Sequence, residues 1–173
     1  MKSNITLIAL NATFKKEIAK QLAERLGMFY VDVNDLIKYD LLNIKQVISV
    51  AGLDYYNKVE TKTVGSVSSY ENTLITLDND TFFNNDNYKL LKDSSIFIYL
   101  KLNFNDYKTI QDNEKDNSEY YEKLLNEKLF IERDLILSSV SDIVVPISLS
   151  TKNKVNTITN KIKKYFKEVL WIN

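Results

Sequence analysis

The feature that most constrains the fold is a repeated alternation of short apolar segments with longer segments of helical periodicity. The first apolar run, 5–9, is followed by apolar residues such as Ile18 and Leu22 at the spacing of one helix face. Gly27 stands where that helix is expected to end. The strongest run, Ser95–Leu100, is typical of a strand that is buried on both faces of a parallel sheet. The alternation predicts an α/β fold with helices on both faces of a parallel sheet and right-handed crossovers.

The same pattern places the individual elements along the chain, which we expect to form a single domain over 1–173. Strands are expected at about 5–9, 28–31, 72–77, 95–100 and 142–147. Helices are expected over a segment ending at 26, over 34–39, over 43–69 in two pieces divided near Gly52, over 87–91, over a segment ending near 139, and over 152–169. Residues 78–86 are interpreted as a polar loop, and the highly charged segment 112–122 as mobile. Ligands of such sheets bind beyond the carboxyl ends of the strands, so function is sought there.

Composition excludes several classes of chemistry. The chain has no Cys and no His, so disulfides, Cys/His zinc sites and histidine-based triads are excluded. Lys plus Arg and Asp plus Glu number 23 each, and this balance argues against a general nucleic-acid binder. No apolar stretch approaches the length of a membrane span, and the cytoplasm is the expected compartment. Only three glycines are present, so any glycine-rich loop would have to use them.

The segment after the first expected strand, Ala9–Glu17, resembles the phosphate-binding loop of shikimate kinases and related small-molecule kinases. The family pattern is G-x-x-x-x-G-K-[ST] between a strand and a helix. Aligned without gaps, Lys15 matches the lysine, whereas Ala9 and Phe14 replace the framework glycines and Ala12 replaces a further glycine. Lys16 replaces the hydroxyl that binds magnesium. The resemblance implies a three-layer α/β/α sandwich with five parallel strands in the order 2-3-1-4-5.

These replacements oppose the usual binding of magnesium-ATP. Such a loop needs glycine for close approach of its backbone to phosphate, and the ring of Phe14 is expected to occupy or deflect that space. An ammonium at Lys16 removes a magnesium ligand and repels the cation. Two interpretations remain open: both lysines are solvated in the first helical turn, or they support weak anion binding at the helix N-terminus. The vestigial phosphate-binding residues are Asn11, Ala12, Thr13, Phe14, Lys15 and Lys16.

The family's D-x-D motif after the second strand corresponds to Asp32-Val33-Asn34. The resemblance implies that Asp32 lies near the metal and that Asn34 stands for the carboxylate that contacts the phosphorylated hydroxyl. An amide can hydrogen-bond a hydroxyl but cannot act as a base. The alternative is an ordinary strand-to-helix turn with an N-cap. If the chain is active, Asp32 and Lys15 are the candidate catalytic residues.

Other family positions are also altered, although the resemblance continues over nearly the whole chain. Gly52, Tyr56 and Glu60 fit the family's G-E-x-x-F-R-x-x-E segment, but its arginine is replaced by Asn57. The triple glycine after the third strand is replaced by Leu77-Asp78-Asn79, which is expected to bring a leucine side chain and a carboxylate against the substrate. The vestigial substrate pocket comprises Asn34, Asn57, Leu77, Asp78, Asn79 and Arg133.

Arg133 is the best preserved substrate-type residue, and the alternative for it is an ion pair on the helix surface with Glu132 or Asp134. The lid of such kinases is expected at about 104–122, yet this segment contains no arginine. The arginine that the family's lid places over the phosphates is therefore missing from this segment.

Three hypotheses follow. The first is a shikimate-kinase-like protein that no longer transfers phosphate and instead binds an unknown small molecule or protein partner, with no cofactor or metal. The second is a divergent kinase for shikimate or a similar metabolite, which would require ATP and Mg²⁺. The third uses the basic helix 161–167 with Trp171 as a docking face for a partner, although such a stripe more often packs on the sheet. Neither nucleic acid nor a membrane is expected as a partner.

Overall fold

The computed structural model describes residues 2–113 and 127–170 and contains one five-stranded parallel sheet. The strands are β1 (Asn4–Ile8), β2 (Phe29–Asp32), β3 (Thr73–Thr76), β4 (Ser95–Lys101) and β5 (Ile143–Pro146). Their order is β2-β3-β1-β4-β5, which confirms the order implied by the family resemblance. Ile5 of β1 pairs in register with Leu74 of β3 and with Ile96 of β4, so β1 lies at the centre of the sheet.

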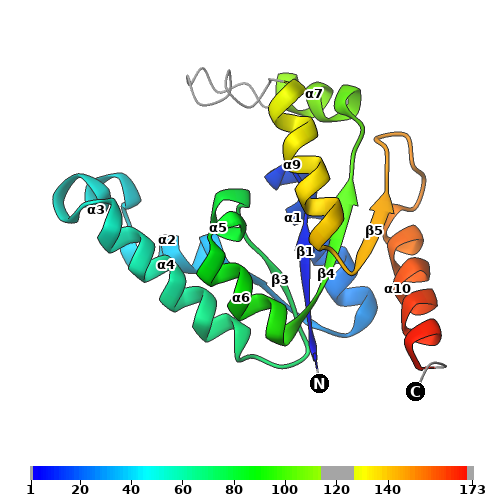
Figure 1. Cartoon of the computed structure of the whole chain (residues 1–173), viewed down its shortest axis with the longest axis horizontal. Helices are drawn as coiled ribbons and strands as arrows, with labels where there is room; N and C mark the ends of the chain where they lie inside the picture. The colour runs from blue at the N-terminus through cyan, green and yellow to red at the C-terminus, as the bar shows by residue number, and fades with distance from the viewer. Residues whose placement is uncertain (1, 114–126, 171–173) are drawn as a thin grey trace.

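Helices cover both faces of this sheet. They are α1 (Ala12–Leu26), α2 (Val33–Leu41), α3 (Ile44–Ala51), α4 (Leu53–Ser68), α5 (Asn79–Phe83), α6 (Asn85–Ser94), α7 (Phe104–Asn113), α9 (Glu127–Val140) and α10 (Lys154–Leu170). In Figure 1, α6 and α9 lie in front of the sheet and α1 lies behind it, where α1 packs against α10. The expected three-layer α/β/α arrangement is therefore confirmed.

Local signals in the sequence explain several boundaries. Gly27 ends α1 in the left-handed region with φ of 67°, and its N–H bonds the carbonyls of the last helical turn. Gly52 separates α3 from α4 with φ of 86°, as the sequence predicted. The strands β1 and β4 are buried almost throughout, which accounts for their largely apolar sequences.

The prediction of a polar loop over 78–86 is wrong. The segment forms α5 and the start of α6, and the Asn84 side chain caps α6 by accepting hydrogen bonds from the N–H groups of Asp86 and Asn87. Phe82 of α5 is 2% exposed and packs edge-on against Phe97 of β4. One of the Asn residues that suggested a loop thus acts as a helix cap, and burial of one aromatic ring anchors the short helix.

The expected lid lies only partly within the described residues. Its first part forms α7, whereas 114–126 lie outside the described residues. The expected docking residue Trp171 also lies outside them. Within 2–113 and 127–170, no helix is long and apolar enough to span a membrane.

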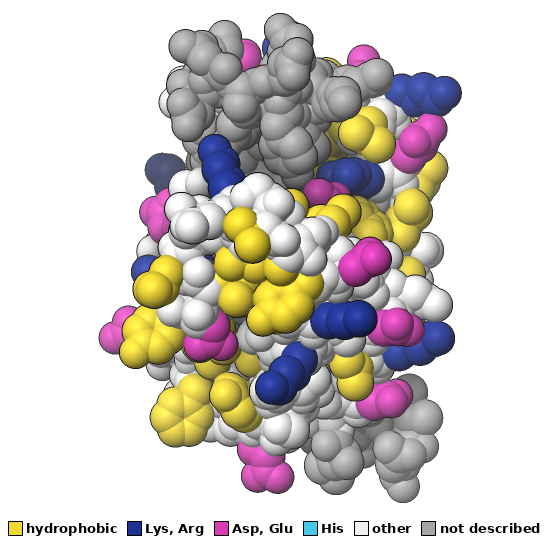
Figure 2. Space-filling view, turned by 90° about the vertical axis from the view of Figure 1, so that its left-hand side faces the viewer, with side chains coloured by type: hydrophobic (Ala, Val, Ile, Leu, Met, Phe, Trp, Pro, Cys, Tyr) yellow, Lys and Arg dark blue, Asp and Glu magenta, His cyan; other side chains and the backbone are white. Residues whose placement is uncertain are grey.

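The face formed by α2, α3 and α4 carries several exposed large apolar side chains. Figure 2 shows hydrophobic side chains spread over this face among lysine and acidic side chains. Those with the greatest exposure there are Tyr39, Leu42, Val50, Leu53 and Tyr55. Strands β2 and β5 form the two opposite edges of the sheet. Helices α2, α3 and α4 lie on the side away from β5, so the apolar face is far from that edge.

Candidate functional site

The connection from β1 to α1 is short. Only Ala9, Leu10 and Asn11 separate the two elements, and α1 already begins at Ala12, three residues before Lys15. The Asn11 side chain caps the helix and accepts a hydrogen bond of 2.7 Å from the N–H of Phe14. A segment that would need an open loop to surround phosphate is thus mostly helical, and one N–H of its first turn is already bonded within the chain.

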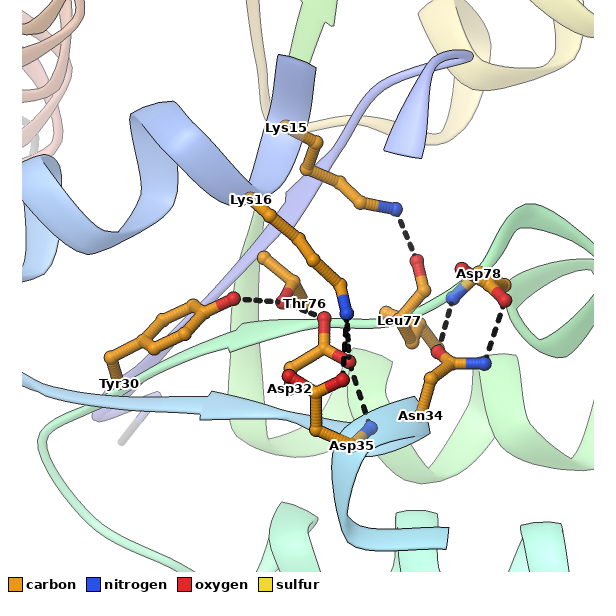
Figure 3. A network of polar contacts seen from close by, with 9 residues as sticks. All are labelled: Lys15, Lys16, Tyr30, Asp32, Asn34, Asp35, Thr76, Leu77 and Asp78. Atoms are coloured by element: carbon orange, nitrogen blue, oxygen red, sulfur yellow. Dashed lines mark hydrogen bonds and ion pairs between the residues drawn. The ribbon is translucent and has the colours of Figure 1, made fainter. Parts of the chain in front are cut away.

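Lys15 is buried rather than solvated, so the first interpretation of this residue is wrong. Its side chain is 1% exposed, and Nζ donates a hydrogen bond to the carbonyl oxygen of Leu77 at the end of β3 (Figure 3). Burial lowers the pKa of Lys15 to about 8, although the carboxylates of Asp78 and Asp32 oppose this shift. A part of the Lys15 population is therefore neutral just above neutral pH.

Lys16 balances the charge of two carboxylates at the end of β2. Its Nζ lies 3.1 Å from Oδ1 of Asp32 and 2.8 Å from Oδ1 of Asp35 (Figure 3). Burial lowers the pKa of Lys16, but the hydrogen bonds to Asp35 and Asp32 outweigh burial and leave the pKa raised. Lys16 is therefore a stable cation at the position where the resemblance implies a magnesium ligand.

Asp32 has both oxygens engaged. Oδ1 accepts the N–H of Asp35 at 3.0 Å, which confirms the predicted N-cap, and Oδ2 accepts the hydroxyl of Thr76 at 2.6 Å. The hydroxyl of Tyr30 completes the chain of hydrogen bonds by donating to Thr76 at 3.1 Å. With Lys16 added, Asp32 is held by three partners and is only 5% exposed.

Asn34 bonds with Asp78 across 44 positions of sequence. Its Nδ2 donates to Oδ2 of Asp78 at 2.7 Å, and its Oδ1 accepts the Asp78 N–H at 2.9 Å (Figure 3). This two-point bond joins the first turn of α2 to the residue that precedes α5. The Asn34 amide, which the sequence analysis assigned to a substrate hydroxyl, thus already bonds Asp78 through both its nitrogen and its oxygen.

A cavity of about 610 Å³ opens beside these loops, between the start of α1 and helices α4 and α5. It brings together five of the six predicted pocket residues: Asn34, Asn57, Asp78, Asn79 and Arg133. The exception is Leu77, whose side chain is 2% exposed in the core, so the expectation that it meets a ligand is wrong. The predicted phosphate-binding residues Asn11, Ala12 and Thr13 line the same cavity.

Arg133 closes one side of this cavity by an ion pair that the sequence did not predict. Its Nη2 lies 3.1 Å from Oδ1 of Asp80 on α5, and its guanidinium lies 5.5 Å from the centre of the Phe83 ring. The alternative interpretation, an ion pair with Glu132 or Asp134, is wrong, because the guanidinium pairs with Asp80 and Asp134 bonds Tyr99 and Lys101 of β4.

Glu60 is the buried acid of the cavity wall, with 7% exposure. Its two oxygens accept hydrogen bonds from the Thr81 hydroxyl at 2.8 Å and from Nδ2 of Asn87 at 3.2 Å. Burial raises the pKa of Tyr56 to about 12, and the charge of Glu60 and a hydrogen bond to it add to the shift. Tyr56 therefore remains protonated at neutral pH.

Phe14 points away from this cavity. It is 7% exposed and lines a second cavity of about 420 Å³ with Ile18 and residues of the loop between β5 and α10, such as Thr151 and Asn153. Two cavities therefore flank the start of α1, one on each side.

Three polar residues around these sites were missed by sequence reasoning. They are Asp35, Asp80 and Gln111. Asp35 carried a weak signal, because it stands three residues after the capping Asp32, in the first turn of a helix. Asp80 and Gln111 carried none, since their partners and neighbours are far away in the sequence.

The geometry agrees with comparisons of the sequence with known proteins. The sequence model of the family described as shikimate kinase matches residues 11–164. The chain belongs to the shikimate kinase family. Among curated relatives, the shikimate kinase of Caldicellulosiruptor bescii is 31% identical over 98 residues, which cover 56% of this chain and 57% of that protein. The shikimate kinase of Francisella philomiragia is 25% identical over 170 residues, or 95% of each chain.

The matches with the first relatives are partial, because they span less than two thirds of those proteins. Solved structures extend the similarity to the whole fold. The shikimate kinase of Acinetobacter baumannii, determined in complex with shikimate, has a TM-score of 0.74 and 19% identity, covering 97% of this chain and 94% of that one. The Aquifex aeolicus enzyme has a TM-score of 0.71 and 20% identity, with coverage of 96% and 98%.

Proposed function

We propose that this member of the shikimate kinase family binds a small molecule or a protein partner and does not transfer phosphate. The observation that carries the proposal is the position of Lys16, whose ammonium lies 3.1 Å from the carboxylate of Asp32. A magnesium ion at Asp32 would have to displace this internal cation, at a Coulomb cost of roughly 1–4 kcal/mol for charges at contact distance.

The residues present do not suit magnesium. Both oxygens of Asp32 are hydrogen-bonded within the chain, and the hydroxyl ligand expected at Lys16 is replaced by an ammonium. Mg²⁺ requires oxygen ligands in near-octahedral geometry. Within 2–113 and 127–170, no group of three or more acidic side chains is placed to hold a metal. No catalytic step through magnesium is therefore assigned.

The start of α1 also lacks the open loop that would bind the phosphates of a nucleotide. Phosphate cradles use several backbone N–H groups that converge on the anion from a loop. Here α1 begins early, and the Asn11 side chain takes the N–H of Phe14. Lys15 directs its amino group to the Leu77 carbonyl, and burial depresses its pKa, which weakens it as a counter-charge.

A second candidate function is a divergent kinase that acts on a hydroxyl of shikimate or a similar metabolite. The two cavities on either side of the start of α1 favour it, because a nucleotide and an acceptor would need separate sites that meet near Lys15. In that case Lys15 would have to break its hydrogen bond to the Leu77 carbonyl, and Lys16 would have to break its ion pair with Asp32, before either could bind phosphate.

Calorimetric titration and a coupled assay distinguish these two functions. We expect no binding of ATP with Mg²⁺ at micromolar concentrations and no ADP release in the presence of shikimate. The Aquifex aeolicus shikimate kinase serves as the positive control in the same buffers. Turnover that is lost in Lys15→Ala would overturn the proposal and establish the divergent kinase.

A further inference from the structure

The cavity of about 610 Å³ has an unusual balance of charge. Its described wall contains three carboxylates, from Glu60, Asp78 and Asp80, and a single cationic side chain, Arg133. Arg133 is already paired with Asp80 at 3.1 Å, so its charge is largely balanced within the chain. Lys15 does not line this cavity, because its side chain is buried and bonded to the Leu77 carbonyl. An anionic ligand would therefore meet net negative charge.

The neutral part of the wall is rich in side-chain amides. These residues are Asn11, Asn34, Asn57, Asn79, Asn84 and Gln111. Amides can in principle offer donors or acceptors to a ligand. The hydrogen bonds already made within the chain decide which of the two is left over.

Two of these amides leave a buried acceptor without a partner. Oε1 of Gln111 has no hydrogen-bond partner among the described residues, although Gln111 is only 7% exposed. Asn79 donates its Nδ2 to the carbonyl of Leu10 at 3.1 Å, whereas its Oδ1 is buried and likewise unbonded within the described part of the chain. Buried acceptors without partners are costly, and a ligand whose N–H or O–H groups reach them from the cavity would satisfy them.

Neutral hydrogen-bond donors hold the carboxylates of Glu60 and Asp78 in the cavity wall. Glu60 is fixed by the Thr81 hydroxyl and by Nδ2 of Asn87, so it cannot turn away from the cavity without losing both bonds. These neutral donors hold the carboxylate in place without cancelling its charge. Asp78 is held in the same manner by the neutral amide of Asn34. The hydrogen-bond donors that hold both carboxylates are thus neutral, although the charge of the buried Lys15 also acts on Asp78.

We propose that this cavity binds a small hydroxylated amine, whose ammonium is attracted by Glu60 and Asp78 and whose hydroxyl and ammonium hydrogens satisfy Gln111 and Asn79. The proposal rests on the proposed binding function and names its ligand class. The cavity should therefore prefer a cationic ligand to an anionic one, because the single guanidinium of its described wall is paired with Asp80. A bare metal ion is the poorer occupant, since no described cluster of acidic side chains has the arrangement of a metal site.

Three sugars that share one ring provide matched probes: glucosamine, glucose and glucuronate, which are cationic, neutral and anionic at neutral pH. Binding to the full chain is followed by NMR chemical-shift changes at low ionic strength, where charge effects are least screened. We expect glucosamine to bind in the millimolar range and at least about tenfold more tightly than glucuronate, with glucose between them.

Two substitutions locate the effect in the cavity. Asp78→Asn should reduce the preference for glucosamine over glucuronate several-fold. Asp80→Asn should release Arg133 and strengthen glucuronate binding. The matched control is Asp93→Asn, which removes the same charge from an exposed residue of α6 outside the cavity and should leave the preference unaltered.

Equal or tighter binding of glucuronate or shikimate by the wild type would overturn the proposal, and so would a failure of all three sugars to shift the signals of cavity residues at tens of millimolar. These outcomes differ from those that test the proposed function. Phosphorylation of shikimate would overturn the function, whereas a preference for glucuronate without turnover would overturn only the ligand class.

Discussion

The ammonium of Lys16 and the carboxylate of Asp32 form an ion pair of 3.1 Å in which the acid is almost fully buried and the lysine is about one quarter exposed. The pair joins the first turn of α1 to the end of β2. It also places a permanent cation at the carboxyl edge of the sheet, where ligands of parallel α/β folds bind. The same contact thus stabilises the fold and opposes a metal at this position.

Removal of Lys16 should leave Asp32 with hydrogen bonds but without its counter-charge. Lys16→Met is expected to lower the free energy of unfolding by about 1–3 kcal/mol, less than for a fully buried pair because the lysine is partly solvated. Urea denaturation measures the change. Lys20→Met, at an exposed position of the same helix, is the matched control and should change stability by less than about 0.5 kcal/mol.

A double-mutant cycle with Asp32→Asn separates this pair from other effects. If the pair carries the stability, the double variant should lose less than the sum of the two single variants. Simple additivity would contradict the assigned interaction and would weaken the argument that Lys16 replaces a metal.

The fold could be predicted from the sequence because its signals are local. The apolar run at Ser95–Leu100 and the glycines at the ends of α1 and α3 each report on a few neighbouring residues, and β4, Gly27 and Gly52 are found where they were expected. The loop predicted at 78–86 failed for a non-local reason. The decisive contact is between Phe82 and Phe97, which are brought together only by the folded sheet.

The site could be predicted only in part. Sequence reasoning placed Asn34, Asn57, Asp78, Asn79 and Arg133 in one pocket, and they do share one cavity. Their pairings were not predictable, because the partners lie far apart along the chain. Arg133 and Asp80 are separated by 53 positions, and Asn34 and Asp78 by 44. Likewise, the burial of Lys15 depends on how α1 packs against the end of β3.

Phe82 should determine whether α5 forms. Phe82→Ala removes a ring that is 2% exposed and is expected to lower the free energy of unfolding by about 3–5 kcal/mol. Because α5 carries Asn79 and Asp80, the same change should also release the ion pair with Arg133. Thermal unfolding tests the first effect, and NMR signals of the Arg133 guanidinium test the second. A variant of wild-type stability would contradict the assignment of α5.

Asp134 should hold α9 on the sheet. Its two oxygens accept the Tyr99 hydroxyl at 2.8 Å and the Lys101 ammonium at 2.6 Å, and burial together with Asp134 raises the pKa of Tyr99. Asp134→Ala leaves a buried hydroxyl without this partner and is expected to cost about 2–4 kcal/mol. Glu132→Ala, at an exposed position of the same helix, is the matched control. Equal stabilities of the two variants would contradict the role of Asp134.

Lys15 should give the stability a distinctive dependence on pH. Its pKa is about 8 in the folded chain and 10.5 for an ordinary solvated lysine, so the unfolded chain binds more protons between these limits. The cost of burying the charge is therefore fully present below about pH 8, and stability rises as the pH increases through this interval. Relative to Lys15→Met, the wild type should gain about 2 kcal/mol of unfolding free energy between about pH 7 and pH 9.5.

Urea denaturation of both proteins across this pH range measures the difference, and the Lys15 Cε resonance should titrate near pH 8 in the same samples. The comparison uses the difference between the two proteins because other groups that titrate in this range contribute to both. Parallel stability profiles, together with a Cε resonance that does not change until above about pH 10, would show that Lys15 is solvated and charged. That result would restore it as a counter-charge for phosphate and would favour the divergent kinase.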